Sequence, residues 1–274
     1  MRGATPVAYD DYTGFTKLWD GQTLKGWDGE TDVWSIDNGA IHADTEKTPG
    51  QHHIHYVGPG AIMKDFDFKV EMRISEMGAN GGIQYRSRLL HPAHGGSIEN
   101  PMGKSLPAGI TTLTAAVAAG ITSVPPPPAD PAAAGGRGGP REAPNPWQVS
   151  GYQLDLDSGN NYTGGLYEGQ GRGIVNLPGG IVQLLPGRQQ ARIGTVTENP
   201  AQWVKPHKGL EGEWNQLEIV ARGNTLVHIV NGHVITVSVD DNPTDRALQG
   251  ILSLQLEGRG QIWYRNVYVK HLDK

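Results

Sequence analysis

Hydrophobic and polar residues alternate along much of the chain. The segment 66–74 carries apolar side chains at every second position, with charged ones between them. A period of two is typical of a strand with one buried face. The segment 214–222 alternates in the same way, and its Leu217 side is expected to face the core. Both segments predict strands of a β-sandwich.

Further strands are predicted towards the C-terminus. Two β-branched runs in 225–239 flank Asn231 and Gly232, a pair that favours the positive φ angles of a tight hairpin turn. The run 260–272 again has the residues of a pleated surface. With 39 Gly and 19 Pro among 274 residues, many turns and short strands are expected. We predict one all-β domain spanning 1–274.

One stretch interrupts this pattern. From about 89 to 146 the chain is rich in Ala, Gly and Pro, with four consecutive prolines at 125–128. Such a composition favours extended, irregular backbone. We interpret it as a long insertion whose only plausible helix is 111–119. It is either a disordered surface excursion or a lid, because long loops in compact domains are often functional.

Three predicted strands carry hydrogen-bonding side chains opposite their apolar faces. The rows are Gln84, Arg86 and Arg88; Gln153, Asp155 and Asp157; and Ser253, Gln255, Glu257 and Arg259. Amide, guanidinium and carboxylate groups offer the paired donors and acceptors that sugar hydroxyls need. If the strands are neighbours, the rows form the floor of a carbohydrate site. The alternative is that Arg86 and Arg88 merely form ion pairs across strands.

Aromatic residues flank these rows, and an aromatic ring offers sugar C–H groups an apolar face. They are Tyr85, Trp147, Tyr152, Tyr162 and Tyr167. The glycine-punctuated segment 163–173 is expected to present Tyr167, Glu168 and Arg172 at the rim of the site. No helix pattern follows it, so it is not a nucleotide loop.

No cofactor is firmly predicted. Asp155, Asp157 and Asn161 have the alternate spacing of a calcium loop, but the downstream bidentate Glu is missing. His53 and His55 share one face of an extended chain and offer two zinc ligands, yet no third is identifiable. The commoner explanation for these histidines is a solvated loop before a strand.

Charge and hydropathy narrow the possible partners. The net charge is −5 with both signs interspersed, which argues against nucleic acid. No run approaches the roughly 20 apolar residues of a membrane span. The absence of cysteine fits a reducing cytoplasm or an exported bacterial protein without disulfides. We expect a periplasmic or extracellular location, with the cytoplasm as alternative, although the first residues lack the apolar core of a signal peptide. The oligomeric state is not predicted.

Several short motifs in combination resemble the 3-keto-disaccharide hydrolase domain family, which is related to concanavalin-like lectins and glucanases. They lie at 15–27 (FTKLWDGQTLKGW), 33–39 (VWSIDNG), 65–68 (DFDF), 80–86 (NGGIQYR), 151–157 (GYQLDLD), 164–168 (GGLYE), 212–215 (GEWN) and 263–266 (WYRN). The resemblance implies a concanavalin-like jelly-roll β-sandwich that acts on glycosides whose C3 hydroxyl has been oxidised to a ketone.

The ketone acidifies the proton at C2, so elimination of the glycosidic oxygen needs a base and an oxyanion partner. Our hypothesis gives the base or acid role to Asp155 or Glu168 and the oxyanion role to Arg86. It gives sugar binding to further polar residues of the rows and rim, namely Gln84, Arg88, Gln153, Asp157, Tyr167, Arg172 and Gln255.

The chain departs from the family pattern at two of these positions. Many members have His-Gly where this chain has Glu257 and Gly258, and often Glu where it has Gln153. Two other functions stay open. Asp155 with Glu257 would suit a conventional two-carboxylate glycoside hydrolase. A noncatalytic carbohydrate-binding module is the other, because a fold does not fix a function.

Overall fold

The structure is a computed structural model that describes residues 10–30, 32–75, 78–90, 147–207 and 212–272. The described chain forms two β-sheets packed face to face, with no α-helix, so the predicted all-β sandwich is confirmed. The expected insertion falls outside these residues from 91 onward, as does the helix predicted at 111–119. No helix in the described part is long and apolar enough to span a membrane.

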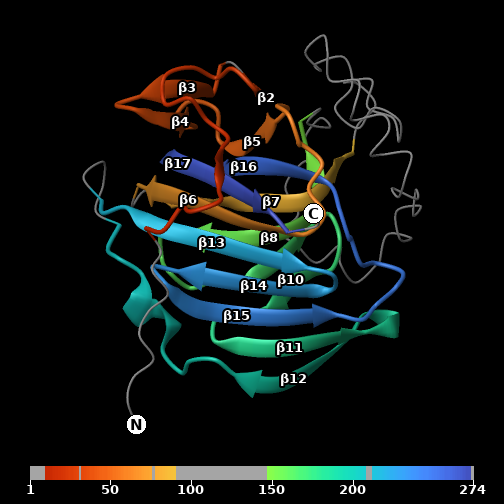
Figure 1. The fold of residues 1–274 in the computed structure, drawn as a ribbon. Helices are drawn as coiled ribbons and strands as arrows, with labels where there is room; N and C mark the ends of the chain where they lie inside the picture. Colours follow the sequence, from red (N-terminus) through yellow and green to blue (C-terminus); the bar gives the residue numbers. More distant parts are fainter. Residues whose placement is uncertain (1–9, 31, 76–77, 91–146, 208–211, 273–274) are drawn as a thin grey trace.

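Sheet A has ten strands in the described part, in the order β12-β11-β15-β14-β13-β6-β17-β4-β3, with β1 also paired to β17. Figure 1 shows β13, β14, β15, β11 and β12 side by side in that order. The strands are β1 (Thr16–Lys17), β3 (Trp34–Asp37), β4 (Ala40–Asp44), β6 (Phe66–Ile74), β11 (Gly180–Leu185), β12 (Gln189–Thr195), β13 (Asn215–Arg222), β14 (Thr225–Val230), β15 (His233–Asp240) and β17 (Gln261–His271).

Sheet B has seven described strands, in the order β10-β9-β8-β7-β16-β5-β2. They are β2 (Trp27–Gly29), β5 (Gly50–Tyr56), β7 (Ala79–Leu89), β8 (Val149–Asp157), β9 (Leu166–Gly169), β10 (Gly173–Asn176) and β16 (Ile251–Gly258). Two short 3-10 turns, Pro186–Arg188 and Pro200–Trp203, lie in the connections after β11 and β12.

The core lies between the inward faces of the two sheets. Phe68 and Leu217 from sheet A and Ile83, Leu154 and Leu254 from sheet B are fully buried, as the period of two requires. The predicted strands 66–74 and 214–222 are thus confirmed as β6 and β13, with the Leu217 side inward. Burial of this apolar surface supplies the main force that holds the sheets together.

Two polar contacts also cross the core. The hydroxyl of Tyr264 in β17 lies 2.8 Å from the carbonyl oxygen of Gln255 and 3.2 Å from that of Gly82. The hydroxyl of Tyr85 in β7 lies 2.8 Å from Nε2 of His228 in β14. Because a buried polar atom needs a partner, these pairs fix how the sheets sit on each other.

The predicted hairpin is confirmed. Asn231 and Gly232 join β14 to β15 with φ angles of 49° and 80°, as a primed two-residue turn requires. The Asn231 side chain holds the turn by donating to the Trp203 carbonyl at 2.7 Å and by accepting from the Gln216 amide at 2.9 Å.

Replacing Gly232 with Ala should therefore destabilise the fold by about 1 kcal/mol, because a Cβ disfavours positive φ. The free energy of unfolding from urea titrations measures this. Gly50→Ala serves as the control, since Gly50 lies in a strand without a positive φ. Equal losses in both variants would contradict the turn argument.

Candidate functional site

The polar rows predicted on three strands lie side by side. β7 stands between β8 and β16, and β5 follows β16. Gln84 is opposite Gln153 on one side and Ser253 on the other, and Gly82 is opposite Asp155 and Gln255. His55 and His53 of β5 continue these two rows. We call the side of sheet B that points away from sheet A, at these positions, the polar face.

Asp155 is the most perturbed acid of the polar face. Its side chain is buried and accepts hydrogen bonds from the Leu156 amide and from Nε2 of Gln153, both at 3.0 Å. Burial raises the pKa of Asp155 to about 7, and the charges of Asp157 and Glu257 act in the same direction. A carboxyl group with such a pKa exchanges protons near neutral pH, as a general base or acid must.

Three glutamines on the polar face have side-chain oxygens with no hydrogen-bond partner among the described residues. Gln84, Gln153 and Gln255 are buried, and Oε1 of each accepts no hydrogen bond. The orientation of Gln153 is fixed, because its Nε2 donates both to Asp155 and to the Gly81 carbonyl at 3.2 Å. Buried acceptors without partners are uncommon, and hydroxyl groups of a sugar would satisfy them.

His53 and His55 belong to β5 and are buried on the polar face, so the interpretation as a solvated loop is wrong. Nε2 of His53 lies 3.2 Å from Nε2 of Gln84, and Nδ1 of His55 lies 2.6 Å from Oγ of Ser253. The two rings are 6.3 Å apart and nearly parallel. Alternation of Gln51, His53 and His55 with apolar Ile54 and Tyr56 was the signal for this strand.

Gly82 leaves the centre of the polar face without a side chain. A Cβ at this position would lie 2.3 Å from the Leu154 carbonyl oxygen, and the φ angle of 154° also favours glycine. Nearby, the Gln84 amide lies 3.3 Å from the place of a Cβ on Gly169 in β9 and also contacts His53 in β5. The sheet therefore curves around Gln84, since β9 and β5 are each two strands from β7.

Asp157 has a different task from Asp155. Its carboxylate accepts hydrogen bonds from the backbone amides of Asn161 at 3.0 Å and Tyr162 at 2.8 Å, and so holds the turn after β8. These contacts occupy the oxygens that a calcium loop would use. In the described parts of the chain no three His, Cys, Asp or Glu side chains are grouped to hold a metal ion.

Arg86 does not join the row of Gln84. A β-bulge interrupts the pairing of β7 after Tyr85, and Arg86 adopts a φ of 48°. Its guanidinium donates to the carbonyls of Lys64 at 2.8 Å and Gly223 at 2.7 Å and pairs with Asp65 at 3.1 Å. The predicted row of Gln84, Arg86 and Arg88 is thus wrong, and so, for Arg86, is the alternative of an ion pair with a carboxylate of the other rows.

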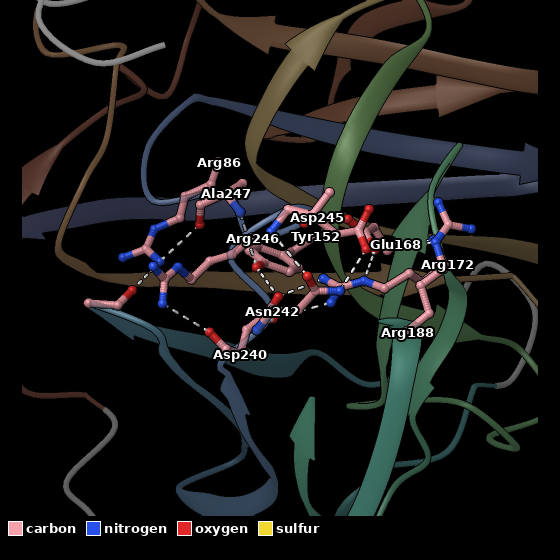
Figure 2. A network of polar contacts seen from close by, with 12 residues as sticks. Arg86, Tyr152, Glu168, Arg172, Arg188, Asp240, Asn242, Asp245, Arg246 and Ala247 are labelled. Carbon is pink, nitrogen blue, oxygen red and sulfur yellow. Dashed lines mark hydrogen bonds and ion pairs between the residues drawn. The ribbon is translucent and has the colours of Figure 1, made fainter. Parts of the chain in front are cut away.

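The structure also separates Glu168 from Asp155. Glu168 is opposite Tyr152, so it points towards sheet A, where it pairs with Arg172. The guanidinium of Arg172 also binds Asp240 of β15 at 2.6 Å, and the Tyr152 hydroxyl donates to Asp240 at 2.5 Å (Figure 2). These four buried side chains form an ionic clamp between β9 and β15, away from the polar face.

The remaining predicted residues lie at different places on sheet B or next to it. Tyr167 is opposite Gln153, and burial together with the charges of Glu257 and Asp155 raises its pKa. Glu257 lies two residues beyond Gln255 along β16, opposite Asn80. Arg88 follows the bulge, opposite Ser150. Of the other flanking aromatics, Tyr85 and Tyr152 are core residues, Tyr162 is exposed, and the Trp147 ring lies 5.9 Å from that of His55.

Comparison with known proteins agrees with this architecture. The model of the 3-keto-alpha-glucoside-1,2-lyase-like domain matches residues 14–270. The chain belongs to this family. It is therefore a carbohydrate-related domain, as the sequence motifs indicated. No curated protein matches the chain significantly.

Three solved structures illustrate the range of similar folds. A protein of unknown function with a galectin-like fold from Bacillus subtilis is 10% identical, with 90% of each chain covered and a TM-score of 0.50. A putative glycosyl hydrolase from Parabacteroides distasonis ATCC 8503 is 15% identical, covering 98% of this chain and 99% of its own, with a TM-score of 0.48. A carbohydrate binding module from Bacillus subtilis is 10% identical over 89% and 95%, with a TM-score of 0.44.

Replacing Arg172 with Met should destabilise this member of the family by about 3–5 kcal/mol, because Glu168 and Asp240 would be left as buried, unpaired carboxylates. Denaturant unfolding measures the loss. The exposed Arg192, which contacts Thr195, provides the matched control in Arg192→Met. A loss below about 1 kcal/mol, the range of surface ion pairs, would contradict the clamp.

Proposed function

We propose that this protein cleaves the glycosidic bond of 3-keto-glycosides by elimination and that Asp155 is the base. The observation that carries the proposal is the position of this buried carboxyl group, with a pKa near 7, among sugar-compatible amides on one sheet face. Membership of the 3-keto-alpha-glucoside-1,2-lyase-like family supports the choice of substrate.

The reaction needs proton removal from C2 next to the ketone. Ionised Asp155 takes this proton, electrons of the broken C2–H bond delocalise onto the C3 oxygen, and an enolate forms. When the ketone is restored, a C1=C2 double bond forms and the C1–O bond breaks. The departing alcohol takes a proton from the protonated acid or from water, so charge and atoms balance.

Substrate binding falls to the amides of the polar face. The oxygens of Gln84, Gln153 and Gln255 would accept hydrogen bonds from sugar hydroxyls, and the bare backbone at Gly82 lets a ring approach the sheet. Tyr167 lies beside Gln153, where its ring would contact sugar C–H groups. The proposal assigns no chemical step to Arg86 or Glu168, because Lys64, Gly223 and Asp65 hold the first and the ionic clamp holds the second.

A two-carboxylate hydrolase is the second candidate. Asp155 and Glu257 are close enough for the charge of Glu257 to raise the pKa of Asp155, so two acids do face the same region. Such an enzyme would protonate the leaving oxygen with one acid and use the other as nucleophile or base. It would cleave unoxidised glycosides, which elimination cannot do.

Substrate comparison decides between these functions. We expect release of nitrophenol from a nitrophenyl 3-keto-glucoside and none from the plain nitrophenyl glucoside. Asp155→Asn should lower kcat by about 10²–10⁴-fold, the usual contribution of a general base. Asp44→Asn is the control, since Asp44 is an exposed acid at the end of β4. Strong cleavage of the plain glucoside would favour the hydrolase, and sugar binding without any cleavage would favour a binding module.

The rate should also depend on pH through Asp155. A base acts in its ionised form, and its pKa is raised to about 7, so kcat/KM should fall about tenfold per pH unit below that value. Above it, kcat/KM should reach a plateau. Initial rates on the 3-keto-glucoside between about pH 5 and about pH 9 test this, and a profile independent of pH across the range would exclude Asp155 as the base.

A further inference from the structure

We propose that His53 is a catalytic residue that donates the N–H of Nδ1 to the oxygen at C3 of the sugar. The inference rests on the proposed elimination, in which that oxygen gains negative charge. Stabilisation of such an oxyanion by a positioned donor is among the largest contributions to catalysis. Because the guanidinium of Arg86 is held away from the polar face, the donor must come from elsewhere.

The contact with Gln84 sets the tautomer of His53. Nε2 of Gln84 lies 3.2 Å from Nε2 of His53. An amide nitrogen only donates, so the ring nitrogen that faces it accepts and carries no hydrogen. In the neutral ring the hydrogen must then be on Nδ1. That atom is fully buried and has no hydrogen-bond partner in the part of the chain that the structure describes.

His53 also stays neutral over the working range of pH. Burial, assisted by the nearby His52, lowers the pKa of His53 to about 3. A neutral imidazole donates a hydrogen bond without giving up its proton to the enolate. Because His53 carries no charge, it does not lower the pKa of Asp155, and the roles of base and hydrogen-bond donor stay with separate residues.

The register of sheet B puts His53 and Asp155 at the two ends of one row. His53 is opposite Gln255, which is opposite Gly82, which is opposite Asp155. The middle of the row lacks a side chain at Gly82. A sugar ring that lies over Gly82 would present its C2–H to Asp155 and the neighbouring C3 oxygen to His53. The base and the donor would thus act on adjacent carbons of one substrate.

Two amide substitutions at His53 distinguish a catalytic role from a role in holding the Gln84 side chain in place. The side-chain nitrogen of Asn takes the place of Nδ1 and can donate there, whereas the longer side chain of Gln reaches the place of Nε2, where its oxygen can accept from Nε2 of Gln84. We therefore compare His53→Asn and His53→Gln by steady-state kinetics on the nitrophenyl 3-keto-glucoside, with Thr48→Ala as an exposed control. The expected result is a fall in kcat of about 10²–10³-fold for His53→Gln, the usual effect of losing one oxyanion donor. His53→Asn should recover most of this rate, and KM should change little in either variant.

Which of the two variants has the higher kcat decides the role of His53. If His53 only supports Gln84, His53→Gln keeps that contact and should be the more active variant, which would overturn the proposal. Nitrogen-15 NMR of the imidazole in the wild-type protein is a second test, independent of folding of the variants. A neutral ring with hydrogen on Nδ1 is expected, and hydrogen on Nε2 would overturn the proposal. A wild-type chain inert towards 3-keto-glucosides would refute the proposed reaction itself, and the role of His53 with it.

Discussion

The antiparallel register of β8, β7 and β16 is the constraint on which the site depends. It pairs Asp155 with Gly82 and Gln255, so residues 73 and more positions apart in sequence lie in one row. Side chains alternate along a strand, and a slip of one residue would turn every polar group of these strands into the core. The apolar inward residues thus hold the site in place, and the Tyr264 hydroxyl, at the carbonyls of Gly82 and Gln255, fixes the same pairs from below.

The two faces of sheet B treat buried polar groups in opposite ways. Towards sheet A, Arg172 pairs with both Glu168 and Asp240, so each of these buried charges has a partner of opposite sign. On the polar face, Asp155 is buried without a counter-charge among the groups that donate to it, and the oxygens of three glutamines have no hydrogen-bond partner among the described residues. Unsatisfied groups cost folding free energy, so stability must come from the core and the clamp. This division explains why a charged residue beside the site need not belong to it.

Strand periodicity was enough to predict the sandwich, the hairpin at Asn231 and the polar rows that hold Gln153, Gln84 and Ser253, whereas only the structure shows that these strands are neighbours. It failed at Arg86, because a bulge shifts the alternation by one residue and leaves no sign in the pattern of residue types. It failed at Glu168 for another reason. The Glu168 carboxylate points inward because it pairs with Arg172, whose guanidinium also binds Asp240. The contact between Arg172 and Asp240 joins residues 68 positions apart, so no local pattern of residue types could reveal it.

The bare backbone at Gly82 has a consequence for how this site can diversify. A Cβ at Gly82 would lie 2.3 Å from the Leu154 carbonyl oxygen. Replacing Gly82 alone with any other residue would therefore disturb the pairing of β7 with β8. A change in what this face binds must therefore come from the surrounding side chains, such as Gln153, Gln255 and Glu257. The backbone thus restricts the residue at the centre of this face, whereas the surrounding side chains can change without a change in the sheet.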